Sequence, residues 1–239
     1  IVGYVGNKGA KSFLIDGLSK LEYRGYDSAG IAVLDGTSIS LAKQKGRLSN
    51  LEGALKSKSS EGTIGIGHTR WATHGEPSDR NSHPHKSSKG DIAVVHNGII
   101  ENYLELRKWL ISEGYEFFSE TDTEVVPNLI HYYYEGNLFE AVVKATKKLE
   151  GSYALGVVCG DEQDKLIAVR KDSPLIVGLG NGENFIASDI PAVIKYTRDV
   201  YLLDDNEFVV MDRNGVSILS ANGERIDKNI YKVTWSEDA

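Results

Sequence analysis

Four residues in three separate segments have the chemistry to hold a small zwitterion and polarise its carbonyl group. Arg70 carries a guanidinium that can bind a carboxylate through two parallel hydrogen bonds. Asp122 can accept an ammonium group. Asn97 and Gly98 place a side-chain amide beside a backbone N–H, as a developing oxyanion requires. The combination predicts a site for an amino acid with a reactive carbonyl, although these segments contain no nucleophile.

Each segment also has an ordinary structural interpretation when it is taken alone. Arg70 fits a surface arginine packed against Trp71, and Asn97-Gly98 fits a common Asn-Gly turn. The acidic segment 119–124 fits the start of a helix, where the helix dipole favours acids. The functional interpretation therefore depends on the three segments together.

Cys159 and the histidines are the other candidates for chemistry. Cys159 is the only cysteine, and its apolar surroundings in 155–159 predict a buried, unreactive thiol. Five of the six histidines lie between residues 68 and 96, which raises the alternative of a metal hydrolase. The sequence has no HExxH spacing, and no carboxylate stands directly beside His83-Pro84-His85. We therefore expect no bound metal.

Composition excludes several classes of function. The 239 residues carry 27 Lys+Arg against 34 Asp+Glu, a net charge of −7, which argues against a binder of nucleic-acid backbones. No stretch of about 18 apolar residues is present, so we expect no membrane span. One cysteine cannot form an internal disulfide, which fits a reducing cytoplasm.

The predicted secondary structure places the candidate residues just after strands. Apolar alternation predicts strands at 1–6, 30–34, 38–42, 63–68 and 91–96. Asp35-Gly36 predicts a hairpin turn between two of them. Arg70 lies at a strand end, beside a loop predicted over 69–90, and Asn97-Gly98 follows the last strand. Structureless loops of about 20 residues are usually functional.

Helical spacing of apolar residues predicts most of the remaining elements. The predicted helices are 8–22, Tyr103 to a C-terminal cap at Gly114, one capped at its start by Asp122 or Thr123, 138–149, and one near Asp189. Short strands occupy most of 153–219. Strands connected mainly by hairpins predict two stacked antiparallel sheets with helices outside them.

Six motifs, in order along the chain, resemble the glutaminase domains of the glucosamine-6-phosphate synthase family, the isomerising glutamine–fructose-6-phosphate aminotransferases. The motifs are Ile1–Gly6, Leu21–Gly30, His68–Gly75, Asn81–His85, His96–Gly98 and Ser119–Glu124. The resemblance implies an α+β fold, the four-layer αββα sandwich of two mostly antiparallel sheets found in N-terminal nucleophile hydrolases. It also implies a type-2 glutamine amidotransferase domain over 1–222. Residues 223–239 would then begin a linker to a sugar isomerase domain that this sequence lacks.

The resemblance implies a catalytic mechanism as well. In this family, Cys-Gly stands immediately before the residue that matches Ile1. The cysteine thiolate attacks the side-chain amide of L-glutamine, and its own α-amine acts as the base. Asn97 and Gly98 hold the oxyanion, and Arg24 lies near the nucleophile. Without that cysteine, the sequence as printed is expected to be inactive.

Substrate-binding roles follow from the same resemblance. Arg70 holds the carboxylate of glutamine and Asp122 its amino group. Thr73 and His74 line the pocket. Trp71 resembles a lid that closes over the site and excludes water.

The resemblance implies no cofactor. Ammonia passes to fructose-6-phosphate on the isomerase domain and gives glucosamine-6-phosphate, in hexosamine biosynthesis. The full-length protein is expected to be a cytoplasmic homodimer. Two alternatives stay open: the glutaminase domain of another type-2 enzyme, such as amidophosphoribosyltransferase or asparagine synthetase, and a glutamine-binding module without a nucleophile.

Overall fold

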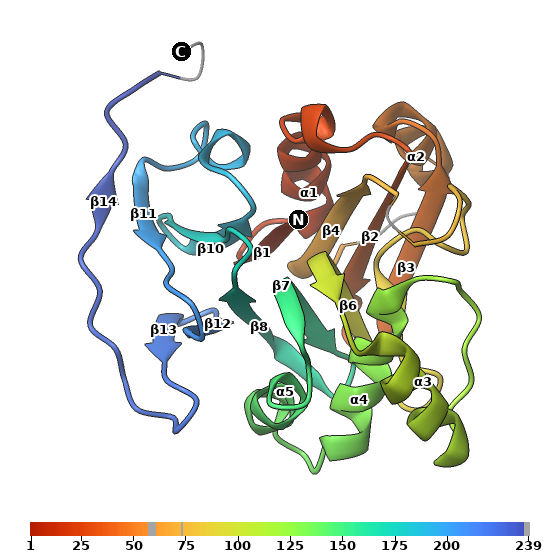
Figure 1. The fold of residues 1–239 in the computed structure, drawn as a ribbon. Coiled ribbons are helices and arrows are strands. Elements are labelled where there is room, and N and C mark those ends of the chain that lie inside the picture. The colour runs from red at the N-terminus through yellow and green to blue at the C-terminus, as the bar shows by residue number, and fades with distance from the viewer. Residues whose placement is uncertain (57–60, 73, 237–239) are drawn as a thin grey trace.

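The computed structural model describes residues 1–56, 61–72 and 74–236, and these residues form two antiparallel sheets (Figure 1). Sheet A contains, in spatial order, β14 (Tyr231–Lys232), β11 (Asp199–Leu202), β9 (Ile176–Leu179), β10 (Glu183–Ala187), β1 (Val2–Gly6), β4 (Ile64–Arg70), β2 (Ser28–Leu34) and β3 (Ile39–Lys45). Sheet B contains β13 (Gly215–Leu219), β12 (Phe208–Asp212), β8 (Glu162–Lys171), β7 (Gly151–Cys159), β6 (Ile92–Ile100) and β5 (His85–Lys86).

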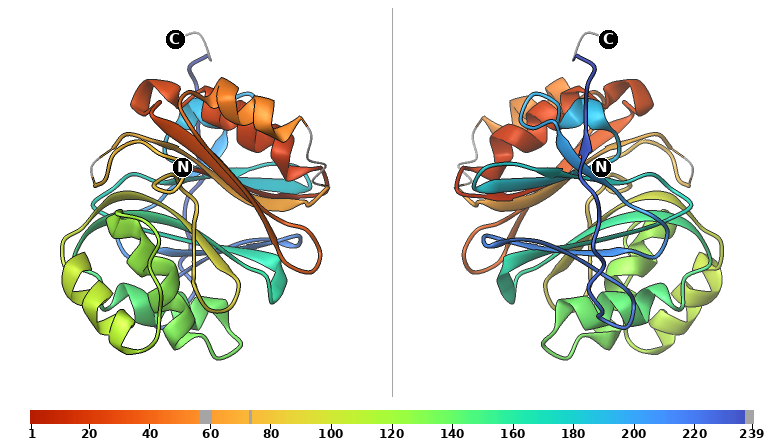
Figure 2. Two further views of the ribbon diagram at one scale, coloured as in Figure 1. Left: turned by 90° about the vertical axis from the view of Figure 1, so that its right-hand side faces the viewer. Right: turned by 90° about the vertical axis from the view of Figure 1, so that its left-hand side faces the viewer.

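The two sheets lie face to face between two layers of helices, as Figure 2 shows. Helices α1 (Ala10–Ser19) and α2 (Leu48–Leu55) cover the outer face of sheet A. Helices α3 (Tyr103–Ser112), α4 (Val125–Tyr133) and α5 (Leu138–Thr146) cover the outer face of sheet B. The predicted αββα sandwich is therefore confirmed. Within the described residues, no helix is long and apolar enough to cross a bilayer.

Strand β4 shows how the sequence specifies this packing. Its alternating Ile-Gly-Ile-Gly pattern turns Ile64 and Ile66 into the core between the sheets. Gly65 and Gly67 face α1, where a Cβ would lie 2.9 Å from Leu14 and 3.1 Å from a Leu18 methyl group. The glycines thus let α1 lie close against the sheet.

Local structure differs from the predictions in several places. The segment 48–55 is a helix for which the sequence analysis made no prediction, and the loop predicted over 69–90 contains the end of β4 and the strand β5. Strand β6 does not end at residue 96, because β7 pairs with it as far as Ile100. A 3₁₀ turn, Asp122–Glu124, precedes α4, so neither Asp122 nor Thr123 is its N-cap. The helix near Asp189 is only the 3₁₀ turn Ile190–Ala192.

The tail after residue 222 crosses the edge of both sheets (Figure 1). Strand β14 pairs with the edge strand β11, Val233 is buried, and Trp235 packs against the cluster under α1. The division of the chain at residue 222 stays a prediction.

Candidate active site

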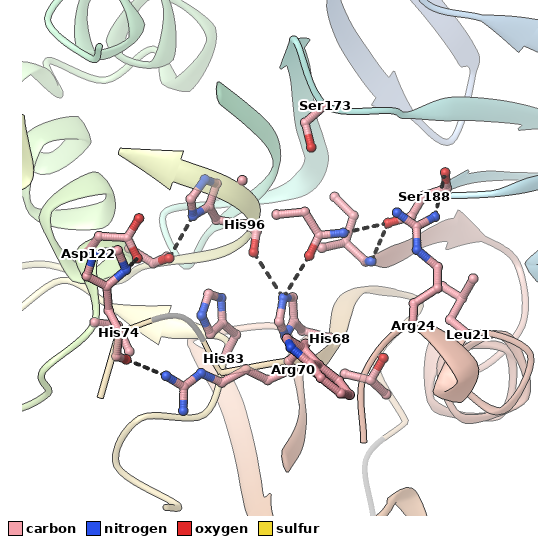
Figure 3. Close-up of a pocket in the computed structure, with 17 residues that line it drawn as sticks. Leu21, Arg24, His68, Arg70, His74, His83, His96, Asp122, Ser173 and Ser188 are labelled. Atoms are coloured by element: carbon pink, nitrogen blue, oxygen red, sulfur yellow. Dashed lines mark hydrogen bonds and ion pairs between the residues drawn. The ribbon is translucent and has the colours of Figure 1, made fainter. Parts of the chain in front are cut away.

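A cavity of about 260 Å³ opens between the two sheets, where the start of β1 and the ends of β4 and β6 meet. It is lined by predicted site residues that are far apart in sequence: Arg24, Arg70, Trp71, His74, Asn97, Gly98 and Asp122. Figure 3 shows Asp122 and His74 at one end of the cavity, Arg24 and Ser188 at the other, and His68 between them. Thr73 lies outside the described residues.

Asn97 lies within β6 of sheet B, opposite Ala154 of β7, and its side-chain amide reaches His68 of sheet A and Ser188 just after β10. Its Oδ1 lies 3.0 Å from His68 Nε2, and its Nδ2 donates to Ser188 Oγ at 2.9 Å. Among the described residues the second Nδ2 hydrogen has no acceptor, so it is available to a ligand. Asn97 and Gly98 therefore sit in the pocket as strand residues and not as the Asn-Gly turn that the sequence also allowed.

Gly98 has a conformation that requires glycine. Its φ is +116°, and a Cβ would lie 2.3 Å from the Ser152 carbonyl oxygen. A side chain at this position would force β6 away from β7. The backbone beside Asn97 is therefore held by close strand pairing.

The nitrogen of Ile1 is buried at the floor of the same pocket. It donates to Ser188 Oγ at 2.6 Å, so Ser188 accepts hydrogen bonds from both Ile1 and Asn97. Arg24 donates to the Ser188 carbonyl at 3.3 Å. Burial, followed by the nearby Arg24 charge, lowers the pKa of an amine at Ile1 from 8.0 to about 4. A peptide N–H would make the same hydrogen bond without the cost of burying a charge.

Arg70 is the last residue of β4, and its guanidinium is buried in the pocket wall. It donates to the carbonyls of His74, Gly75 and Glu76, which uses three of its five N–H groups. Arg70 therefore shapes the following loop, and within the described residues two of its N–H groups have no hydrogen-bond acceptor.

Asp122 is buried in the 3₁₀ turn that directly precedes α4. Its Oδ2 accepts a hydrogen bond from Ile100 N–H at 2.8 Å, and its Oδ1 lies 3.7 Å from His74 Nδ1. Its negative charge remains in the pocket, where an ammonium group could pair with it.

Trp71 is exposed and stands beside the pocket mouth. Its ring makes an edge contact with Tyr26 at 5.6 Å between centroids. A Cβ at Gly25 would lie 2.7–2.8 Å from the Arg70–Trp71 backbone, so the glycine permits close packing of the turn that carries Arg24. The lid role of Trp71 stays a prediction.

Four buried histidines form a group in the pocket wall, where His68, His83 and His96 line the cavity and His85 lies behind them. The rings of His68 and His83 stack with centroids 4.0 Å apart and planes 10° apart, and His85 contacts His83 at 4.8 Å. Burial lowers the pKa of each of these three histidines well below the usual range, and it also lowers the pKa of His96. Among the described residues, no three ligands converge on one point that could hold a metal ion.

His68 and Ser188, the two residues that hydrogen-bond to the Asn97 side chain, were not singled out from the sequence. His68 entered the sequence analysis as the end of a predicted strand and the first residue of the His68–Gly75 motif, and Ser188 only as part of 153–219, where short strands were predicted. Each makes its contact with Asn97 across the gap between the sheets, which no local pattern specifies. Cys159 is buried and does not line the pocket, and burial raises its pKa, as expected for an inert thiol.

Comparison with known proteins adds independent information. Residues 68–195 match the model of the glutamine amidotransferase domain family. The whole chain is 66% identical to a glutamine–fructose-6-phosphate aminotransferase (isomerizing) of Clostridium tetani and 65% identical to that of Clostridium perfringens. It covers 39% of the length of each of these relatives.

Among solved structures, the glutamine phosphoribosylpyrophosphate amidotransferase of B. subtilis, in complex with ADP and GMP, is 25% identical to the chain. Its TM-score is 0.80, and the match covers 96% of this chain and 49% of that one. A structure of the allosteric regulatory enzyme of purine biosynthesis has a TM-score of 0.82 at 24% identity, over 96% and 53% of the two chains, and shows the shared fold.

Proposed function

The chain belongs to the glutamine amidotransferase family, and from this premise we propose that its pocket hydrolyses L-glutamine to glutamate and ammonia. The proposal rests on one observation: a single cavity brings together the buried backbone nitrogen of Ile1, the Asn97 amide and the Asp122 carboxylate. The Ile1 nitrogen marks where a chain that carries the nucleophile would enter the pocket, Asn97 suits the oxyanion, and Asp122 suits the substrate amine.

The proposed nucleophile is a cysteine in a Cys-Gly pair directly before Ile1. A chain extended from the Ile1 nitrogen would enter the pocket within reach of Asn97 and Ser188. The environment of that nitrogen also favours a peptide N–H over a charged amine. The α-amine of such a cysteine, with an ordinary pKa of about 7.7–8.0, would take the thiol proton at neutral pH.

The reaction then has two stages. The thiolate adds to the carboxamide carbon, and Asn97 Nδ2 and Gly98 N–H donate to the oxyanion. The C–N bond breaks, and the α-ammonium gives its proton to the leaving nitrogen, which departs as ammonia. Water then adds to the thioester, the C–S bond breaks, and glutamate leaves with the thiol restored.

Substrate recognition uses the opposite end of the pocket. Arg70 would bind the α-carboxylate with its remaining donors, and Asp122 would bind the α-ammonium. His74 lies between them, and Thr73 is assigned to the pocket wall by family resemblance. Trp71 would close over the mouth and exclude water.

In the longer protein, ammonia would be delivered to a second domain. The Clostridium relatives are named glutamine–fructose-6-phosphate aminotransferases, and this chain covers only 39% of their length. We therefore assign the acceptor as fructose-6-phosphate on a sugar isomerase domain beyond a linker at 223–239, in hexosamine biosynthesis. The proposal includes a cytoplasmic homodimer. An amidophosphoribosyltransferase function is less well supported, because that relative shares only 25% identity.

The test begins with intact mass and N-terminal sequencing of the purified full-length protein, followed by an ammonia-release assay with glutamine. We expect an N-terminal cysteine, and replacing it by alanine should abolish ammonia release while calorimetry still detects glutamine binding. Binding without turnover in the wild-type protein would indicate a glutamine-binding module. Turnover that survives loss of the cysteine but requires zinc would indicate a metal hydrolase.

A further inference from the structure

We propose that His68 is a positioning residue, which donates a hydrogen bond from Nε2 to Asn97 and thereby holds the Asn97 amide in the orientation that binds an oxyanion. This inference rests on the proposed glutaminase function and adds a residue to it. His68 would not touch the reacting atoms through this bond, because its effect passes through the Asn97 side chain.

The hydrogen-bond partners of His68 determine which ring nitrogen carries the proton. Nε2 lies 2.9 Å from the His96 carbonyl oxygen and 3.0 Å from Asn97 Oδ1. Both partners are acceptors, so Nε2 must be the donor. His68 Nδ1 is buried and has no hydrogen-bond partner among the described residues, which suits the unprotonated nitrogen of a neutral ring.

The ring cannot easily turn away from Asn97. It is stacked on His83 at 4.0 Å, and its Nε2 is also held by the backbone of β6 through the His96 carbonyl. Burial lowers the pKa of His68 well below its ordinary value, so the ring stays neutral and keeps one donor through the physiological range. The donor is therefore permanent and fixed in direction.

Ser188 holds the other end of the same amide. Asn97 Nδ2 donates one hydrogen to Ser188 Oγ at 2.9 Å, and His68 Nε2 binds the other end of the amide, Oδ1, at 3.0 Å. Turning the amide by half a revolution would place an N–H against His68 Nε2–H and an oxygen against the site of the oxyanion. The two contacts together favour the orientation in which the second Nδ2 hydrogen faces the pocket.

The test compares three substitutions at position 68 in the full-length protein. Glutamine places its Nε2 near the position of the imidazole Nε2 and can still donate, whereas leucine cannot donate. Asparagine is polar but too short to reach Asn97 Oδ1. We expect His68→Leu and His68→Asn to lower kcat for ammonia release by about 10- to 100-fold with KM changed less than about threefold, since a lost oxyanion donor costs about 10²–10³ and a misoriented one less. His68→Gln should recover most of the activity.

His85→Leu is the matched control. His85 belongs to the same buried group of histidines, but its Nε2 bonds to Thr121 Oγ1 at 2.9 Å, and within the described part of the chain it makes no hydrogen bond to Asn97. We expect its kcat to stay within about threefold of the wild type. If His85→Leu and His68→Leu lose kcat equally, the effect comes from general loosening of the histidine group, and the positioning role is wrong.

Ligand binding provides a second measurement that does not depend on turnover. An aldehyde analogue of glutamine adds reversibly to a thiolate and forms an oxyanion, whereas glutamate binds without forming one. His68→Leu should lower the affinity for the aldehyde analogue by about 10-fold or more and leave the affinity for glutamate unchanged. Equal weakening of both ligands would overturn the proposal. If His68→Leu does not fold, the comparison of His68→Asn with His68→Gln decides the question.

Failure of this inference can be distinguished from failure of the proposed function. A wild-type protein without glutaminase activity, or one whose activity survives loss of the N-terminal cysteine, refutes the function itself. An active wild type with full activity in His68→Leu refutes only the role of His68. The pH profile separates positioning from acid–base catalysis: His68→Gln should keep both limbs of the wild-type profile, and loss of the acidic limb would assign proton transfer to His68.

Discussion

Asp122 accepts a hydrogen bond from the backbone N–H of Ile100 at 2.8 Å, and this contact ties the turn before α4 to the end of β6. Asn97 and Gly98 lie on the same strand, so the proposed amine site and the proposed oxyanion site share one rigid support. The distance between the two ends of a bound glutamine is therefore set by a strand and not by a loop.

Asp122→Asn should weaken substrate binding more than it slows chemistry. Asparagine keeps an oxygen that can accept from Ile100, so the turn should remain in place, but the negative charge is lost. Because hydrogen bonds to charged groups contribute about 1.5–3 kcal/mol, we expect KM for glutamine to rise by roughly 10- to 100-fold. Steady-state ammonia release measures this. An unchanged KM would remove Asp122 from the amine site.

Asn97→Ala should have the opposite kinetic signature. It removes a donor needed chiefly when the oxyanion forms, so kcat should fall by roughly 10²–10³-fold with a small change in KM. Ammonia release over a range of glutamine concentrations separates the two constants. A kcat near that of the wild type would exclude Asn97 from the oxyanion site.

Arg70→Ala should affect both binding and stability. Its guanidinium donates to three carbonyls of the following loop, so alanine removes loop contacts as well as the proposed carboxylate partner. We expect KM to rise by at least about 30-fold, because truncating one partner of a buried charge pair costs about 2–5 kcal/mol. The melting temperature should also fall. A normal KM in a destabilised protein would leave Arg70 with a structural role alone.

Sequence patterns predicted the layers and the charged ends of the pocket, but not its central contacts. The Ile-Gly alternation of β4 and the helical spacing in α4 report which faces are buried, and these fix the sandwich. Arg70 and Asp122 could be identified from the sequence, because a charged side chain next to an apolar strand or helix needs a binding or structural role there. Ser188 joins Ile1 and Asn97 from 187 and 91 residues away, and such a contact depends on how the sheets stack.

Gly98→Ala should destabilise the protein through a local clash. The added Cβ would lie 2.3 Å from the Ser152 carbonyl oxygen at a φ of +116°. We expect a loss of about 1–3 kcal/mol in the free energy of unfolding, measured by urea titration, together with reduced kcat. Gly136→Ala is the matched control, since Gly136 has a φ of +92° but open space around its Cβ position. Equal losses in the two variants would mean that strain, and not the clash, dominates.

The buried histidines predict that stability decreases on acidification. His68, His83, His85 and His96 have pKa values lowered by burial in the folded state, against 6.5 for an ordinary histidine. The unfolded chain therefore binds more protons than the folded one below about pH 6.5, and the free energy of unfolding falls as the pH falls. Each histidine contributes up to about 1.4 kcal/mol per pH unit between its unfolded and folded pKa values.

Urea unfolding between pH 7.5 and 5.0 tests this linkage, because most carboxylates remain ionised in both states over that range. The free energy of unfolding of the wild type should fall by several kcal/mol over this range. The slope of that free energy against pH should be smaller in His85→Leu, by the equivalent of up to about one proton. A free energy of unfolding that is flat from pH 7.5 to 5.0 would contradict the prediction, since it would require the four histidines to titrate normally inside the folded protein. An unaltered slope in His85→Leu would show that His85 does not contribute to the linkage.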